Sequence, residues 1–114
     1  MYKQGDILLI PIPFTDLTST KKRPVLVLSN NSYNDKTNDI LVAAITSNIS
    51  EKDYTVMISK VDLEIGDLKV DSCIRTDKIY SLSQGIVIKT FGRVKLHIMN
   101  RVKDKLNQLI CNQE

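Results

Sequence analysis

The sequence predicts an α+β fold that is mainly β: a curled antiparallel sheet or small barrel followed by one C-terminal helix. Short apolar segments rich in β-branched residues follow one another between polar, turn-forming clusters, and only the last part of the chain changes to a helical period. The 114 residues, 42% of them hydrophobic, are enough for one core but not for two. Residues 1–114 are therefore expected to form a single domain.

Three strongly apolar segments are expected to form the first strands. Residues 7–12 (ILLIPI) end at Pro13, and proline ends a strand or restricts it to a sheet edge. Residues 24–29 (PVLVLS) and 40–46 (ILVAAIT) have the same character, with polar clusters on both sides. Three weaker segments complete the predicted sheet: residues 54–58, 70–76 and 85–91.

The C-terminal segment is expected to be an amphipathic helix that begins near Lys95. Its apolar residues recur at steps of three and four, and Lys and Arg occupy the opposite face. These apolar residues are Leu96, Met99, Val102, Leu106, Leu109 and Ile110. No Ser, Thr or Asp stands directly before the first of them, so the start of the helix is placed only to within about three residues.

Residue types exclude membrane and metal proteins. The apolar runs are far shorter than the roughly 20 residues that cross a bilayer, and the N-terminus has no signal-peptide pattern, so we expect a cytoplasmic protein without membrane contact. Cys73 and Cys111 lack CxxC spacing and are expected to be reduced packing residues. His97 is the only histidine, which predicts neither a metal site nor a cofactor.

The carboxylates and the net charge leave the function open. Asp35 with Asp39, and Asp62 with Glu64 and Asp67, lie among turn-forming residues and are expected to belong to solvated loops. The formal net charge is +3, and residues 89–114 hold 6 of the 16 Lys and Arg residues but 2 of the 13 Asp and Glu residues. This excess permits phosphate binding through counterion release, and a solvated helix face explains it equally well.

The polar connection of residues 14–23 is the first candidate for chemistry. Three hydroxyl residues, Thr18, Ser19 and Thr20, precede the cations Lys21, Lys22 and Arg23, and such donors suit an anionic oxygen. A mobile, solvated loop is the alternative interpretation. Pro24 steers the residue before it to extended geometry, so the Arg23 guanidinium starts from a constrained backbone. It could grip two phosphate oxygens or form a surface ion pair.

Two further candidates lie at strand ends. Thr46 closes the third predicted strand, where its hydroxyl is expected to emerge at the rim of the sheet or to cap the strand end. Residues 71–78 (DSCIRTDK) combine Ser72 and Arg75 with carboxylate neighbours. Taken alone, this segment is typical of a salt-bridged strand end.

Taken together, these segments resemble the MazF/PemK family of bacterial toxins in order and spacing. The matching stretches are Gly5-Asp6-Ile7, residues 22–29 (KRPVLVLS), 42–46 (VAAIT) and 71–79 (DSCIRTDKI), and the likeness extends to Gly92-Arg93-Val94 and the terminal helix. The resemblance implies an SH3-like barrel with a C-terminal helix, a homodimer and a cognate antitoxin as partner. It also implies a metal-independent, sequence-selective endoribonuclease that cleaves single-stranded RNA, typically messenger RNA.

The resemblance also assigns roles to residues. The family's catalytic arginine falls on Arg23 and its catalytic Thr or Ser on Thr46. The loop hydroxyls imply a substrate contact at Ser19, with Thr18 or Thr20 as substitutes. Lys22, Ser72 and Arg75 complete the expected substrate-binding set. Many family members carry Gly before the arginine and an acidic or Gln residue in a longer loop, so this chain departs from the pattern where base selectivity is set.

The expected reaction uses the 2′-OH of RNA as nucleophile and leaves a 2′,3′-cyclic phosphate and a 5′-OH. Arg23 would hold the scissile phosphate and Thr46 would donate a hydrogen bond to it. The proton carrier stays open, because arginine is a poor base and His97 lies far away in the sequence, where a surface or packing role is expected. A non-catalytic nucleic-acid- or protein-binding barrel is one alternative. A gyrase-poisoning toxin of the CcdB type is another, although such toxins act through a tryptophan-bearing C-terminal end and this chain has no tryptophan.

Overall fold

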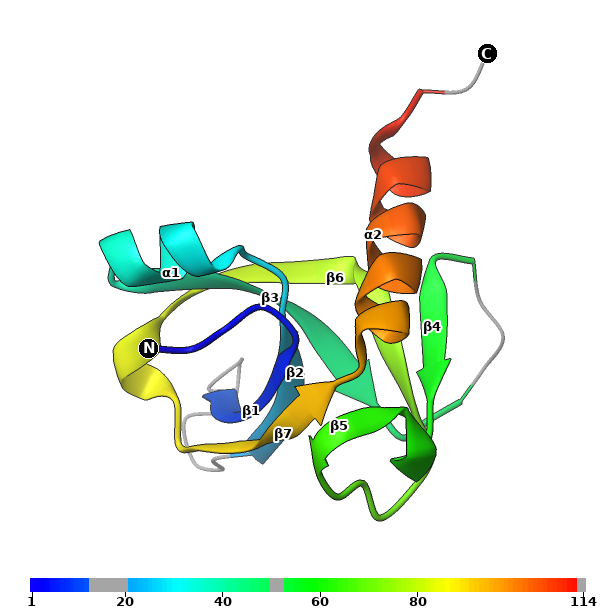
Figure 1. Ribbon diagram of the computed structural model, residues 1–114, viewed down its shortest axis with the longest axis horizontal. Helices are drawn as coiled ribbons and strands as arrows, with labels where there is room; N and C mark the ends of the chain where they lie inside the picture. Colours follow the sequence, from blue (N-terminus) through cyan, green and yellow to red (C-terminus); the bar gives the residue numbers. More distant parts are fainter. Residues whose placement is uncertain (13–20, 50–52, 113–114) are drawn as a thin grey trace.

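The structure is a computed structural model that describes residues 1–12, 21–49 and 53–112. Within these residues seven strands form one antiparallel sheet in the order β4-β6-β3-β2-β1-β7-β5, which curls into a half-barrel (Figure 1). The strands are β1 (Asp6–Ile12), β2 (Lys21–Val27), β3 (Asp39–Thr46), β4 (Thr55–Ile58), β5 (Leu63–Gly66), β6 (Ser72–Ser83) and β7 (Lys89–Val94). The helices are α1 (Asn31–Lys36) and α2 (Leu96–Ile110), with 3₁₀ turns η1 (Lys60–Asp62) and η2 (Gln84–Ile86). The predicted fold class, mainly β with a C-terminal helix, is confirmed.

Strand β1 lies between two strands from distant parts of the sequence. It pairs with β2, where Ile7 lies opposite Leu26, and with β7, where Asp6 lies opposite Arg93. The Arg93 guanidinium reinforces this second ladder, because its Nε donates to Asp6 Oδ1 at 2.8 Å. The N-terminus is thereby joined to the last strand.

Both faces of the sheet carry apolar side chains, because successive residues of a strand point to opposite faces. Among the described residues, the first core comprises Ile7, Leu26, Ala43, Ile45, Val56, Ile58, Leu63, Ile74, Val94, Ile98, Met99 and Val102. The second core comprises Leu8, Ile10, Val25, Val27, Ile40 and Val42. Helix α2 therefore covers the first face, whereas Tyr2, Tyr80, Leu82 and Val87 pack against the second.

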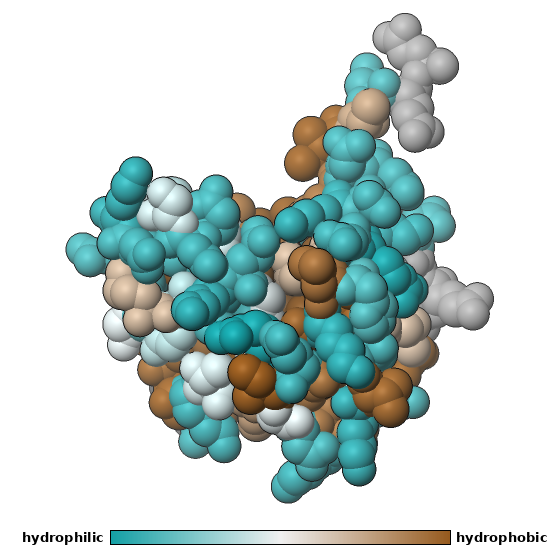
Figure 2. Space-filling view, in the orientation of Figure 1, coloured by the Kyte–Doolittle hydropathy of each residue, from teal (hydrophilic) through white to brown (hydrophobic). Residues whose placement is uncertain are grey.

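Helix α2 begins where the sequence predicts it. It buries Ile98, Met99 and Val102, and much of its surface is hydrophilic in Figure 2. The apolar stripe is not buried along its whole length, because Leu96, Leu109 and Ile110 are exposed. Within the described part of the chain, no side chain caps its first turn; the backbone N–H of Lys95 instead donates to the Asp62 carbonyl at 2.8 Å. None of the described helices is long and apolar enough to cross a membrane.

The predicted strand boundaries need correction in three places. Strand β2 starts earlier than predicted, at Lys21, so the last part of the expected loop belongs to the sheet. Strand β6 runs on to Ser83 rather than ending at residue 76. The predicted strand 85–91 is wrong in its first half: residues 85–86 lie in η2 and residues 87–88 connect η2 to β7, which begins at Lys89 and extends to Val94. The residues that pair with β1 and β5 are those of the polar segment KTFGRV, although the apolar run before it has the stronger local preference for a strand.

Two elements have no counterpart in the sequence prediction. Helix α1 is short and polar, and it is stabilised by the Asn30 side chain, which accepts the Tyr33 N–H at 2.8 Å. Strand β5 lies in the carboxylate-rich segment that was expected to form only solvated loops. The cysteine prediction is half correct: Cys73 is buried, whereas Cys111 is exposed just after α2.

Strands β5 and β7 cross so closely that only glycine fits. A Cβ on Gly92 would lie 2.2 Å from the Ile65 carbonyl oxygen. A Cβ on Gly66, whose φ is +93°, would lie 2.2 Å from the Phe91 carbonyl oxygen. This close approach fixes the sheet edge that lies next to the start of α2.

Candidate functional site

The register of the sheet assigns Arg23 and Thr46 to the same face, just beyond the end of the β2–β3 ladder. The β2–β3 ladder pairs Val27 with Val42 and Val25 with Ala44. Continued by two residues, the same register places Arg23 directly across from Thr46. Residues directly opposite each other in antiparallel strands have Cβ atoms about 4.5–5.5 Å apart and share one face. By this extension both residues belong to the face that carries the second core, at the same end of it.

The Arg23 side chain is available to an anion. It is exposed, and none of the described carboxylates forms an ion pair with it. Arg23 pairs with Ile10 on β1 but lies beyond Val25, the last residue of β2 that pairs with β3. Pro24, which stands between them, has no N–H to extend the ladder with β3. A guanidinium offers two parallel donors to the oxygens of a phosphate.

The Thr46 hydroxyl has a defined orientation at the strand end. Its Oγ1 accepts a hydrogen bond from the backbone N–H of Asn48 at 3.1 Å. The expected strand-end cap is therefore present. The same contact leaves the hydroxyl proton free, because a hydroxyl has one donor in addition to its acceptor lone pairs. The cap therefore orients the Thr46 hydroxyl and leaves its proton available for a hydrogen bond to a ligand.

Arg75 lies next to this pair on the same face. It is opposite Ala44 on β3, while Thr46 is opposite Cys73, so Arg75 and Thr46 are diagonal neighbours. The Arg75 guanidinium donates to both oxygens of Asp77, from Nε at 3.0 Å and from Nη2 at 2.8 Å. These hydrogen bonds lower the pKa of Asp77 and raise that of Arg75. The expected salt bridge is present, but it lies within β6 and not at a strand end, because β6 continues to Ser83.

The remaining predicted contacts are not brought to this face. Ser72 is buried, and its hydroxyl donates to the Val70 carbonyl at 3.1 Å. Lys22 is exposed, but it neighbours Arg23 along the strand and so points to the other face. Thr18, Ser19 and Thr20 lie outside the described residues.

His97 lies on the other side of the sheet. It is exposed in the first turn of α2, which packs on the first core, and its Nε2 is 3.5 Å from Asp62 Oδ1. The pKa of Asp62 is lowered, mainly by the hydrogen bond from the Ser59 backbone N–H and also by His97. The expectation of a surface histidine away from the site is therefore consistent with the structure. Among the described residues, no group of His, Cys, Asp and Glu side chains is arranged to hold a metal ion.

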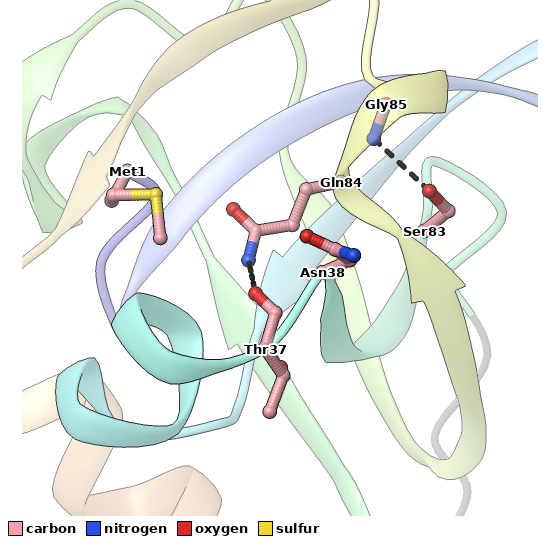
Figure 3. A pocket seen from close by; sticks show the side chains of 6 residues that line it. All are labelled: Met1, Thr37, Asn38, Ser83, Gln84 and Gly85. Carbon is pink, nitrogen blue, oxygen red and sulfur yellow. Dashed lines mark hydrogen bonds between the residues drawn. The ribbon is translucent and has the colours of Figure 1, made fainter.

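A hollow of about 350 Å³ opens at the opposite end of the β3–β6 ladder (Figure 3). It is lined by Met1, Thr37, Asn38, Ser83, Gln84 and Gly85. The Gln84 amide donates to the carbonyls of Asn34, at 2.8 Å, and Thr37, at 3.0 Å, which ties the start of β3 to η2. The lining side chains are uncharged, and none of them is among the predicted site residues.

Several solved structures share this fold. An endoribonuclease from a mycobacterial species, solved in complex with its cognate antitoxin, matches with a TM-score of 0.77 at 17% identity, covering 100% of both chains. MazF from Deinococcus radiodurans matches with a TM-score of 0.75 at 21% identity, covering 96% of each chain. Mycobacterium tuberculosis toxin MazF-mt6 matches with a TM-score of 0.74 at 16% identity, covering 90% of this chain and 93% of that one. At these identities the likeness shows the fold, and it confirms the barrel-like fold that the resemblance implied.

The family assignment comes from the sequence itself. No curated protein sequence matches the chain significantly. A family model described as PemK-like, MazF-like toxin of type II toxin-antitoxin system matches residues 3–110. That range runs from the segment before β1 to the end of α2 and includes Arg23, Thr46 and Arg75. The chain therefore belongs to the family of PemK-like, MazF-like toxins of type II toxin-antitoxin systems.

Proposed function

We propose that this chain is an endoribonuclease that cleaves single-stranded RNA at the rim where Arg23 faces Thr46. The single observation that carries the proposal is the β2–β3 register. Continued by two residues, it sets an exposed guanidinium, without an ion pair to any described carboxylate, opposite a hydroxyl that accepts one hydrogen bond and can still donate. Membership of the toxin family supports it, as does the fold shared with a protein named an endoribonuclease.

The two side chains suit a reaction in which the RNA supplies its own nucleophile. The 2′-oxygen forms a bond to phosphorus, the bond from phosphorus to the 5′-oxygen breaks, and the products are a 2′,3′-cyclic phosphate and a 5′-OH. The proton leaves the 2′-OH and one is delivered to the 5′-oxygen. Arg23 would bind the non-bridging oxygens and stabilise their growing charge, and Thr46 would donate a hydrogen bond to one of them. Neither role calls for a metal-activated water, so we propose cleavage without a metal.

The proposal includes partners and organisation. We propose that residues 1–114 act as one domain in the cytoplasm, pair as a homodimer and are inhibited by a cognate antitoxin. The mycobacterial endoribonuclease is described as bound to its cognate antitoxin, and Deinococcus radiodurans MazF has been solved together with MazE. The recognition sequence of this chain would be set by side chains next to the cleavage rim.

Incubation of the purified protein with a long unstructured RNA in EDTA tests this function. We expect stable fragments with 5′-OH ends, and at least a 10²-fold lower rate for Arg23→Ala because the phosphate loses its charged donor. Arg23→Lys should restore only part of the rate, since an ammonium is a point charge without the planar fork. Lys36→Ala removes an exposed cation from α1 and serves as the charge-matched control. Intact RNA that is bound only at low salt would instead show a non-catalytic binding protein.

A further inference from the structure

Strand β6 carries three extra residues beside the proposed cleavage rim. Its ladder with β3 passes from Ala43 opposite Ile79 to Ala44 opposite Arg75, so residues 76–78 have no partner on β3, a strand described along its whole length. Figure 1 shows β6 bending as it passes from the first part of β3 toward β4. Bulges re-aim side chains and are over-represented beside active sites. This bulge projects Asp77 and Lys78, both exposed.

The bulge is held at its base by a buried threonine. Thr76 is fully buried, its backbone N–H donates to the Tyr54 carbonyl at 3.0 Å, and its hydroxyl donates to the same carbonyl. Tyr54 adopts a φ of 64°, a conformation that side chains with a Cβ rarely adopt. Such backbone outliers persist where the surroundings over-determine them and often mark functional positions. The residues next to Thr76 are therefore presented from a fixed backbone.

The Asp77 carboxylate is fixed in turn by Arg75. Each of its oxygens accepts one hydrogen bond from the guanidinium fork, which leaves further lone pairs on both oxygens. Hydrogen bonding to Arg75 lowers the pKa of Asp77, so the carboxylate is ionised at neutral pH. A third of the Asp77 side chain is exposed. The result is an oriented hydrogen-bond acceptor that faces solvent.

This acceptor lies within a nucleotide's reach of the proposed cleavage rim. Arg75, which holds it, is the diagonal neighbour of Thr46 across the β3–β6 ladder. With the scissile phosphate between Arg23 and Thr46, an adjacent nucleotide can extend its base over the bulge. Because Asp77 neutralises the charge of Arg75, the pair attracts the phosphates of the RNA backbone less strongly. Contact with a base is then favoured over contact with the RNA backbone.

We propose that Asp77 selects the base next to the cleavage position by accepting a hydrogen bond from an exocyclic amino group. The inference rests on the proposed ribonuclease function and adds a specificity determinant to it. Adenine, cytosine and guanine carry such an amino group, and a carboxylate is a known acceptor for the cytosine amino group. Uracil has a single imino N–H between two carbonyl oxygens, which a carboxylate repels. The wild-type protein therefore disfavours uracil at this position.

Sequencing of the 5′ ends of a long transcript cleaved by each variant measures the base preference. For the wild type we expect uracil to be depleted at one position next to the cut. Asp77→Asn can donate to a uracil carbonyl, so the depletion of uracil should fall roughly ten-fold. Asp39→Asn makes the same charge change at the far end of the β3–β6 ladder and should keep the wild-type preference.

Two outcomes would overturn the inference. One is an unchanged base preference in folded Asp77→Asn, and the other is an equal loss of cleavage at all sites, which is the signature of a structural role. Binding of wild-type protein to oligonucleotides blocked by a 2′-deoxy residue at the cut does not depend on any variant folding. Equal affinity for cytosine and uracil at every position would also refute the role of Asp77. Failure of the wild type to cleave any RNA would refute the proposed function. Binding to oligonucleotides with 2′-deoxy residues throughout would then decide on Asp77, because a preference for cytosine over uracil should be lost in Asp77→Asn.

Discussion

The substitution Thr46→Val separates a structural from a catalytic role of the hydroxyl. Valine keeps the branched side chain that suits the end of β3 and removes only the oxygen. The backbone N–H of Asn48 then loses its acceptor at 3.1 Å. Because Asn48 is exposed, water can take the place of that acceptor, and the free energy of unfolding should fall by about 1 kcal/mol or less.

The expected effect on catalysis is much larger. A hydrogen bond to the charge that develops on the phosphate is worth about 3 kcal/mol, so kcat should fall by about 10²–10³-fold while KM changes little. The contrast between the small stability change and the large rate change is the signature of a transition-state contact. Thr46→Ser keeps the hydroxyl and should retain most of the rate.

Single-turnover cleavage of a labelled RNA at saturating protein, together with thermal unfolding of each variant, provides the test. If Thr46→Val cleaves within about three-fold of the wild type, the hydroxyl is a strand cap and no more, and the proposed role of Thr46 is refuted. A rate loss matched by an equal loss in Thr46→Ser would point to packing at the rim instead of hydrogen bonding.

Two further predictions concern the fold. Gly92→Ala places a Cβ 2.2 Å from the Ile65 carbonyl oxygen, so β5 and β7 must move apart. We expect the free energy of unfolding to fall by about 2–3 kcal/mol and the melting temperature by roughly 10 °C or more. An unchanged melting curve would contradict the close approach of the two strands. Asp62 has a lowered pKa, chiefly through the Ser59 N–H at 2.8 Å, so its contribution to stability is present above its unfolded-state pKa and is lost as the pH falls through its folded-state pKa. In chemical unfolding, the stability difference between wild type and Asp62→Asn should thus be full above about pH 4 and shrink in more acidic solution, whereas a difference independent of pH would show that the carboxylate charge is not involved.

The elements that the sequence predicts well are those with a strong periodic pattern. Helix α2 was predictable because its apolar positions recur at helical steps and its start near Lys95 follows directly. Strands β1 and β3 were predictable because they are short, apolar and bounded by polar clusters. In these segments local preference and tertiary packing agree.

The missed elements depend on contacts that a local pattern does not contain. Strand β5 exists because Gly66 and Gly92 allow its backbone to approach β7. Helix α1 is too short and polar for a hydrophobic period, and only the Asn30 cap marked it. The predicted range of β7 was placed too early, because it was based on an apolar run, whereas the residues that pair with β1 are the polar ones after that run.

The site was predictable in part. The Arg-Pro sequence and the strand-end threonine identified Arg23 and Thr46, and the register of β2 and β3 agrees with their proximity. Their catalytic roles stay predictions. Ser72 was chosen by residue type, but its burial and its bond to the Val70 carbonyl could not be foreseen. Asp77 was passed over as a mere salt-bridge partner, because the bulge that presents it appears only when β3 and β6 are paired.

The central position of β1 has a consequence for how the molecule is synthesised. One neighbour of β1 follows it closely in the sequence, and the other is made only after about four-fifths of the chain. Until β7 emerges, one side of an apolar strand carries unpaired backbone groups, an arrangement that recruits other chains. A prematurely terminated product that ends before residue 89 is therefore expected to aggregate or to be degraded, so translation must run almost to completion before the sheet can form.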